Sequence, residues 1–530
     1  MDTYKGFQIK GLHLDLKAQT LRFSAMCDIV RDAAGWGYNT VLLEYQDKFP
    51  FKGDLAALAA PDAMTEEEVL EFVRLCSSLG MEIIPLVQCI GHMYYVLMHD
   101  AFAHLGEEKG VFSHMHAFCP SEPESFTFYT KMADQIMRLH PESRYFHIGG
   151  DETRLSATCP RCAGSDKLDL LNRRYQDCCD WVIEKRYKPV IWSDMLLTHP
   201  ELLPAMKNRV VIMDWDYWSI DRANYASHLW GIEKHNPESW PTTHQALFEP
   251  VVYRVKPHLL NPFPYLRFLQ EQGFEVLAAP AARCAGDPNF VPQSFHKRNC
   301  LEAVYSAAQA GAMGVVVTSW SLRRAPWPTT ENSLIAAAMA MENPGVSDKE
   351  IDDVFSDFHF GVADARLAAI PDLLADAAQK TTAVVDVFTA GLAYPTGDMG
   401  HVEDLPTRLA IKGQKLIGNT QVAQAYADLK FDAESALRTL ERAHPSTPAQ
   451  QYRTAVWHWA AETAKFFGEF VPVLTEARLG QAQITRFENA LHDLRAHNTK
   501  ILSPLLTEYA LQSDDRARIG IFLDYLHSMK

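Results

Sequence analysis

Two adjacent carboxylates, Asp151 and Glu152, follow a pair of glycines in the segment Phe146-His-Ile-Gly-Gly-Asp-Glu-Thr153. Gly149 and Gly150 allow the backbone to turn sharply and to approach a ligand closely. Both acids can then reach one cavity, although neighbours on a regular strand would point apart. Two nearby carboxylates cannot easily both ionise, so we expect one pKa to rise and to supply a general acid near neutral pH. The alternative is a solvated acidic turn.

Aromatic side chains and histidines accompany the acids elsewhere in the chain. Sugar faces stack on aromatic rings, which also carry polar N–H or O–H groups, and five rings are candidates for such a role: Trp192, Trp215, Tyr217, Trp218 and Trp320. Packing alone is the alternative for any one of them. His92 and His147 can orient carboxylates and tune their acidity. With His13, Asp15 and Asp151 they could instead bind a metal ion, although metal-dependent barrel hydrolases usually carry His-x-His on the first strand.

Short apolar segments alternate with amphipathic ones from residue 7 to about residue 340, and this alternation predicts the elements that position these side chains. The predicted strands are Phe7–Asp15, Thr40–Tyr45, Glu82–Val87, Tyr145–Gly149, Pro189–Trp192, Val210–Trp215, Phe274–Ala279 and Gly314–Trp320. The predicted helices between them include Arg22–Ala34, Thr65–Leu79, Ser125–Leu139, Leu168–Lys185 and Lys297–Gln309. Parallel strands need crossover helices, so we predict an α/β fold, a (β/α)8 TIM barrel. A doubly wound open sheet would give a similar pattern, but the count of eight strands favours the barrel.

The ends of the predicted strands are polar, as expected of a barrel enzyme, whose active site lies at the C-terminal ends of the strands. Asp15 ends the first strand, Glu44 lies at the end of the second, His92 follows the third, and Asp151 and Glu152 follow the fourth. The fifth, sixth and eighth strands end in tryptophans. A single polar strand end usually only satisfies a hydrogen bond, but so many together indicate a site.

The remaining chain divides into a long connection and a helical region. Ser219–Gly273 is predicted to carry short helices beside the barrel mouth, with a surface insertion of no role as the alternative. We predict two domains, a catalytic barrel over residues 1–345 and an all-helical C-terminal domain over residues 346–530. Its predicted helices are Asp364–Phe388, Thr407–Ala443, Ala449–Arg478 and Ile484–Leu511, with a loop at Tyr394–Gly400. Trp457 and Trp459 are expected in its core. The helical domain would cap the barrel, form a homodimer or simply stabilise the protein.

Composition narrows the partners and the compartment. The 530 residues are 47% hydrophobic and 22% charged, as in globular proteins, and the formal net charge of -16 argues against a nucleic-acid partner. The N-terminal sequence lacks the pattern of a signal peptide, and no apolar stretch approaches the roughly 20 residues that span a bilayer. We therefore expect a cytoplasmic protein without membrane association.

The ten cysteines are too dispersed for a disulfide scaffold and fit a reducing compartment. Cys159-Pro-Arg-Cys162, together with Cys178 and Cys179, could hold a structural zinc ion. The spacing is not that of a known zinc ribbon, however, and buried free thiols are common. The expectation is therefore a protein without a metal and without a cofactor.

Several segments resemble, in order, glycoside hydrolase family 20, the β-N-acetylhexosaminidases, and the hexosaminidase D branch in particular. His147–Glu152 resembles the family's catalytic signature. The other similar segments are His13–Lys17, Leu43–Pro50, Ile84–Gln88, Gly91–His92, Ala101–Leu105, Trp192–Met195, Trp215–Tyr217 and Ser294–Lys297. The resemblance covers about residues 8–325 and leaves the helical region outside. It implies release of a terminal β-linked GalNAc or GlcNAc from a glycan or small glycoside by a retaining, substrate-assisted mechanism.

The resemblance also implies roles for individual residues. Glu152 protonates the glycosidic oxygen, and Asp151 orients the 2-acetamido group, whose oxygen attacks C1 to form an oxazolinium ion. Tyr217 holds the acetamido oxygen, Glu44 binds sugar hydroxyls, and His92 supports Glu152. The other candidate substrate contacts are Trp192, Trp215, Trp320, His147 and Asp15.

The chain departs from the family at three positions. An arginine commonly precedes the Gly-Leu of the first strand, where this chain has Lys10; an aspartate often occupies position 88, here Gln88; and an acid commonly follows the eighth-strand Trp, here Ser321. Recognition of sugar hydroxyls is therefore expected to differ, while the acetamido chemistry is expected to be intact. Two other functions remain open, a metal-dependent barrel hydrolase and a non-catalytic sugar-binding protein, but the latter has no need of a general acid.

Overall fold

A closed barrel of parallel strands forms the centre of the computed structural model, which describes residues 6–107, 117–153, 155, 157–220, 227–233, 236–256, 259–284, 287–321, 324–375, 417–476 and 479–528. The barrel closes because its first strand pairs with its last. Its strands are β1 (Ile9–Asp15), β2 (Thr40–Glu44), β3 (Glu82–Leu86), β4 (Tyr145–His147), β5 (Lys188–Trp192), β6 (Val211–Trp215), β9 (Glu275–Ala279) and β11 (Gly314–Ser319). A short additional strand, β10 (Ala281–Arg283), pairs with β11. Closure confirms the predicted barrel and excludes the open sheet, and each predicted strand agrees with the observed one to within two residues.

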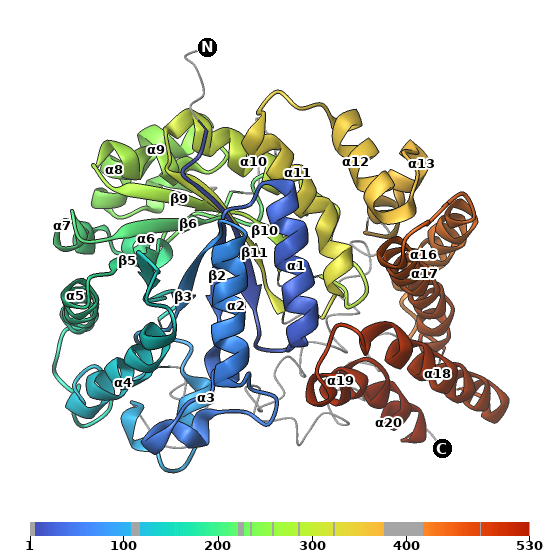
Figure 1. Cartoon of the computed structure of the whole chain (residues 1–530), viewed down its shortest axis with the longest axis horizontal. Helices are drawn as coiled ribbons and strands as arrows, with labels where there is room; N and C mark the ends of the chain where they lie inside the picture. The colour runs from blue at the N-terminus through green and yellow to red at the C-terminus, as the bar shows by residue number, and fades with distance from the viewer. Residues whose placement is uncertain are drawn as a thin grey trace.

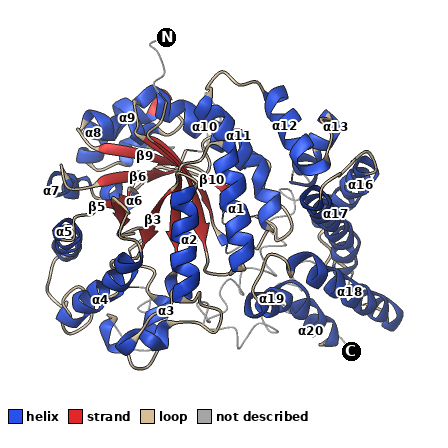
Figure 2. Cartoon of the chain, viewed as in Figure 1, coloured by secondary structure: helices blue, strands red, loops and turns tan. Residues whose placement is uncertain are grey.

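Helices cover the outside of the barrel (Figures 1 and 2). The longer ones in this layer are α1 (Phe23–Trp36), α2 (Glu66–Ser78), α4 (Pro123–Leu139), α5 (Lys167–Glu184), α9 (Pro264–Glu271), α10 (Phe295–Ala310) and α11 (Glu331–Glu342). Local sequence sets their ends: a capping box of Thr65 and Glu68 starts α2, and Gly37, with a φ of 101°, ends α1. Short helices follow two strands more closely: α3 (Tyr94–Leu97), α6 (Asp194–Thr198) and α7 (Leu203–Met206).

The long connection after β6 contains the predicted short helices. Its elements are the 3-10 turn η5 (Pro237–Ser239), α8 (Thr242–Val252) and α9, together with a hairpin of β7 (Tyr253–Val255) and β8 (Leu259–Leu260) that was not predicted. Trp230 of this connection packs on Trp215 at the end of β6, with ring centroids 4.2 Å apart. The connection therefore borders the C-terminal face of the barrel, as expected.

The helical region lies on one side of the barrel (Figure 1). Its described helices are α12 (Asp348–Phe360), α13 (Ala365–Ala368), α16 (Thr420–Leu440), α17 (Pro448–Leu474), α18 (Gln481–Leu502), α19 (Glu508–Asp515) and α20 (Ile521–His527), with a π-helical turn at Arg516–Gly520. Two predictions were wrong in detail. The helix α12, which begins at a capping box of Ser347 and Glu350, was missed, and the predicted Ile484–Leu511 helix is divided between α18 and α19. The predicted loop Tyr394–Gly400 and the rest of residues 376–416 lie outside the described residues.

Polar and apolar contacts join the helical region to the barrel. Arg453 of α17 forms ion pairs with Asp32 of α1 and with Glu331 at the start of α11, the latter at 3.0 Å. One continuous hydrophobic core includes side chains of both regions. Trp457 and Trp459 are fully buried in it, which confirms their predicted packing role. Among the described helices, none combines the length and the apolar character needed to cross a bilayer.

Candidate active site

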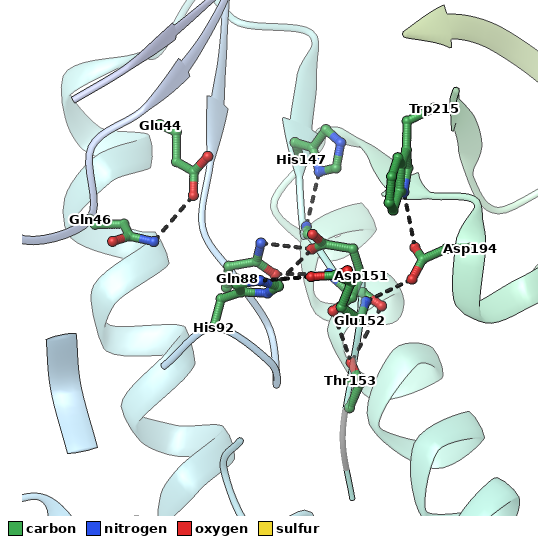
Figure 3. Close-up of polar contacts among 12 residues, drawn as sticks. Glu44, Gln46, Gln88, His92, His147, Asp151, Glu152, Thr153, Asp194 and Trp215 are labelled. Carbon is green, nitrogen blue, oxygen red and sulfur yellow. Dashed lines mark hydrogen bonds and ion pairs between the residues drawn. The ribbon is translucent and has the colours of Figure 1, made fainter. Parts of the chain in front are cut away.

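The backbone after β4 adopts a conformation that turns both predicted catalytic acids into one site (Figure 3). Gly149, Gly150 and Glu152 have φ values of 66°, 90° and 43°, so the alternation of a regular strand is lost. Gln88, from the end of β3, accepts a hydrogen bond from the Gly150 N–H at 3.0 Å and donates one to Asp151 Oδ1 at 2.8 Å. One side chain thus fixes both the turn and the first acid.

Gly149 leaves no room for a side chain, because a Cβ atom there would lie 2.0 Å from Gln88 Oε1. We expect Gly149→Ala to lower the free energy of unfolding by about 3 kcal/mol, since left-handed backbone costs an alanine about 1 kcal/mol and the clash with Gln88 adds the remainder. Gly80→Ala is the matched control, with a φ of 72° and nothing within 4 Å. Urea unfolding of both variants measures the difference. Equal losses would show that Gln88 moves aside freely.

His92 lies between the two acids. Its Nδ1 is 3.8 Å from Asp151 Oδ1 and its Nε2 is 3.6 Å from Glu152 Oε2. Burial lowers the pKa of His92, but the charge of Asp151 and the contact with Glu152 outweigh burial and raise the pKa to about 9. At neutral pH the ring is therefore an imidazolium that holds the consecutive carboxylates on its two sides. Both His92 and Glu152 have left-handed backbone, a kind of strain that concentrates at functional sites.

The raised pKa expected of the pair falls on Asp151. Burial raises its pKa, the His92 cation opposes that rise, and the charge of Glu152 adds to it. The Glu152 side chain is 46% exposed, whereas Asp151 is buried. The raised pKa is thus found on Asp151, the acid for which the sequence resemblance implies an ionised role, and the charge of His92 favours the ionised form.

Asp194, which was absent from the predicted site residues, anchors Glu152. Its carboxylate accepts hydrogen bonds from the Glu152 N–H at 2.7 Å and from Trp215 Nε1 at 3.3 Å. Burial and the charge of Asp151 raise the pKa of Asp194 to about 8, although the Glu152 N–H opposes the rise. The signal was present in the sequence, because Asp194 lies two residues after the end of β5.

A second buried cluster surrounds Lys17, which was also missed. Lys17 Nζ lies 3.0 Å from Glu44 Oε1, 3.8 Å from Asp15 Oδ1 and 4.6 Å from the centroid of Trp320. Burial lowers the pKa of Lys17, but Asp15 and Glu44 outweigh it and hold the pKa above its usual value. Burial alone would raise the pKa of Glu44, but Lys17 and His13 outweigh burial and hold that pKa below its usual range.

Lys10, the residue nearest in sequence to the family arginine, lies elsewhere. It is near the start of β1 and pairs with Glu342 at the end of α11. Asp15, at the opposite end of β1, accepts hydrogen bonds from the N–H and the hydroxyl of Ser321 at 2.9 and 3.0 Å. The cation that lies with the predicted site residues is therefore Lys17, and Ser321 serves to join the ends of β1 and β11.

The predicted aromatic residues form one contiguous group. Trp192 packs on His147 and Trp320, with centroids 4.5 and 6.1 Å apart. Trp320 Nε1 donates to Tyr217 Oη at 2.9 Å, and Tyr217 stacks on Trp215 at 4.9 Å. Together with the contacts of His92, Asp194 and Lys17, this group brings all the predicted site residues together: Asp15, Glu44, His92, His147, Asp151, Glu152, Trp192, Trp215, Tyr217 and Trp320.

Three of these residues have almost no surface exposed to solvent. Glu44 and His147 are completely buried, and Trp192 is almost so. Burial lowers the pKa of His147 to about 3, so its ring is neutral, and its Nδ1 accepts a hydrogen bond from the Gly149 N–H at 2.9 Å. Such burial suits support of the site better than direct contact with a sugar.

The geometry gives no support to the metal-dependent alternative. A metal site needs several histidine, cysteine or carboxylate ligand atoms close together. Among the described residues, three such atoms lie within 4.8 Å of one another in one cluster only, Cys119, Cys159 and Cys162. His13, Asp15, His92 and Asp151 do not form such a group. The alternative in which Cys178 and Cys179 join Cys159 and Cys162 around a zinc ion is not supported either, because Cys178 lies beside Cys89 instead.

The fold and the site together define a TIM-barrel protein that carries a carboxylate pair among aromatic rings at the C-terminal ends of its strands. Residues 51–229 match the family model described as "Glycosyl hydrolase family 20, catalytic domain". The matched segment runs from after β2 into the connection after β6, and it includes β3, β4, β5 and β6.

Two relatives carry the name Hexosaminidase D. The one from Bos taurus is 40% identical over 221 residues, which are 39% of this chain and 62% of the bovine protein. The one from Homo sapiens is 34% identical over 222 residues, 40% of this chain and 45% of the human protein. The chain thus spans less than two thirds of the length of either relative. Among solved structures, a β-N-acetylhexosaminidase from Bacteroides fragilis has a TM-score of 0.46 and 17% identity, and the match covers 66% of this chain and 69% of that one.

Proposed function

We propose that this protein is an exo-acting β-N-acetylhexosaminidase that removes terminal β-linked GalNAc or GlcNAc from a glycan or small glycoside. The observation that carries the proposal is the placement of Asp151 and Glu152 at the two nitrogens of one imidazolium, with Asp194 joining Glu152 to Trp215 (Figure 3). The match of residues 51–229 to the glycosyl hydrolase family 20 model and the similarity to two proteins named Hexosaminidase D support it.

The proposed reaction is substrate-assisted and proceeds in two displacements. In the first, the acetamido oxygen attacks C1 while the bond from C1 to the glycosidic oxygen breaks and Glu152 gives its proton to that oxygen. Asp151 accepts the acetamido N–H and stabilises the positive charge of the oxazolinium ion. In the second, water attacks C1, the bond from C1 to the acetamido oxygen breaks, and Glu152 takes up the proton of the water. Two inversions at C1 retain the β configuration.

The aromatic group is assigned to the acetamido group and the sugar face. Tyr217 Oη accepts a hydrogen bond from Trp320, which leaves its own hydrogen to donate to the acetamido oxygen. The Asp194 carboxylate accepts hydrogen bonds from Trp215 and from the backbone of Glu152. One carboxylate therefore positions both the Trp215 ring and the proposed proton donor. The ten cysteines are buried and form no disulfide, which suits a reducing compartment, and we assign the protein to the cytoplasm.

Hydrolysis of aryl glycosides tests this function directly. The full chain should release the aglycone from 4-nitrophenyl β-GalNAc or β-GlcNAc, and NMR should detect the β-anomer of the free sugar before mutarotation. The matching β-glucoside should not be cleaved, because it lacks the acetamido nucleophile. Binding of either sugar without turnover would favour the sugar-binding alternative, and an initial α-anomer would exclude the proposed mechanism.

A further inference from the structure

Three buried cysteines gather outside the proposed active site. Cys119 precedes α4, while Cys159 and Cys162 lie in the loop between β4 and α5. The Cys119 sulfur is 3.7 Å from that of Cys159 and 3.4 Å from that of Cys162. With Leu170 they form a small core separate from the main hydrophobic core. Nothing in the proposed reaction uses these thiols.

The turn Cys159-Pro-Arg-Cys162 directs hydrogen-bond donors at sulfur. The backbone N–H groups of Arg161 and Cys162 point to the sulfur of Cys159, and the Arg161 side chain interacts with that of Cys119. Gly164, with a φ of 84°, lets the chain leave the turn. Donors placed in this way stabilise a thiolate, the form of cysteine that binds metal ions.

The spacing of the sulfurs matches one metal ion in particular. Zinc binds thiolates at about 2.3 Å in a tetrahedron, which places neighbouring sulfurs about 3.8 Å apart. A disulfide would need about 2.05 Å and would leave the third thiol without a role. Soft thiolate ligands in tetrahedral geometry select zinc over harder divalent ions.

We propose that Cys119, Cys159 and Cys162 are three ligands of a structural zinc ion, whose fourth position is taken by water or another donor. This departs from our expectation of a protein without a metal. The ion would tie the loop that leaves Asp151 and Glu152 to the segment that enters α4. Zinc would thereby position the loop without contacting substrate, so the proposal stands independently of the proposed function.

Metal content tests the site without an activity assay. The full chain, purified under reducing conditions with zinc supplied and then dialysed, should contain about one zinc ion per chain. Cys119→Ser and Cys162→Ser should each lower that content at least about tenfold, since loss of one of three thiolates removes most of the affinity. Cys27→Ser is the control, because Cys27 is a buried thiol in α1, away from the cluster, and the variant should keep its zinc.

Cobalt titration of the metal-free wild-type chain keeps the proposal testable if a serine variant fails to fold. A thiolate-to-cobalt charge-transfer absorption should appear and should be abolished by one equivalent of zinc. Wild-type protein without zinc and without this absorption would overturn the proposal. So would a folded Cys119→Ser variant with full zinc content, or a mass that shows two of the three thiols joined in a disulfide.

Discussion

Glu152→Gln is expected to lose about 10²–10⁴-fold in kcat/KM on a β-N-acetylhexosaminide whose aglycone is a sugar or an alkyl alcohol. An alkoxide leaves poorly without a proton, and a glutamine amide cannot supply one. With a 2,4-dinitrophenyl aglycone the leaving group needs no proton, so the first displacement should survive. The loss should then shrink, and a rapid burst of dinitrophenol should precede a slow second step in which water lacks its general base.

The dependence on leaving group separates chemistry from folding. Glu67→Gln, the same change at an exposed position of α2, should leave both substrates unaffected. The glutamine at position 152 keeps the backbone N–H that donates to Asp194, so the turn after β4 should be preserved. A loss of equal size on both aglycones would mean that Glu152 does not act as the proton donor.

The barrel and the acid pair were predictable because they depend on local sequence. Buried strands of a parallel barrel are apolar runs of few residues, and polar residues beyond their C-terminal ends converge whatever the connections between them. The pair Gly149 and Gly150 indicated a sharp turn, and the structure shows left-handed backbone at both residues. The strand ends and the acid pair were therefore enough to predict the candidate site before any tertiary contact was known.

The residues that were missed depend on contacts between distant segments. Lys10 is closest in sequence to the family arginine, but Lys17 lies at the other end of β1 and meets Glu44 from β2. Asp194, which follows β5, accepts a hydrogen bond from the N–H of Glu152, which follows the neighbouring strand β4. Cys119 joins Cys159 across 40 positions of sequence. Such partners follow from strand order and loop path, which no local pattern contains.

Burial was the other quantity that the sequence did not supply. Two adjacent acids predict that one pKa rises, but they do not say which one, and desolvation of Asp151 decides it. The start of α12, by contrast, could have been predicted from sequence, because Ser347 and Glu350 have the spacing of a capping box.

Asp151→Asn is expected to lose about 10²–10³-fold in kcat/KM and to bind a thiazoline analogue of the oxazolinium ion more weakly by a similar factor. The analogue carries the ring that forms when the acetamido oxygen attacks C1, so it reports on the charge that Asp151 stabilises. Asp151 is buried, accepts a hydrogen bond from Gln88 at 2.8 Å and lies beside the His92 cation, so its charge acts in a site of low dielectric. Affinity for the uncharged product sugar should fall much less.

The dependence of kcat/KM on pH also tests the role of Asp151, and the direction of its pKa shift predicts the direction of the change. Because the pKa of Asp151 is raised, its useful carboxylate form is lost as pH falls, and the loss begins at a higher pH than for an ordinary aspartate. The acidic limb of kcat/KM in the wild type should therefore be shifted upward, and Asp151→Asn should lose that limb along with most of its activity. Asp28→Asn, at an exposed position of α1, should change neither the limb nor the affinity for the thiazoline. If Asp151→Asn kept its thiazoline affinity, the charge that stabilises the intermediate would have to come from another group, and Glu44, whose charge also acts on Asp151, would be the first to test.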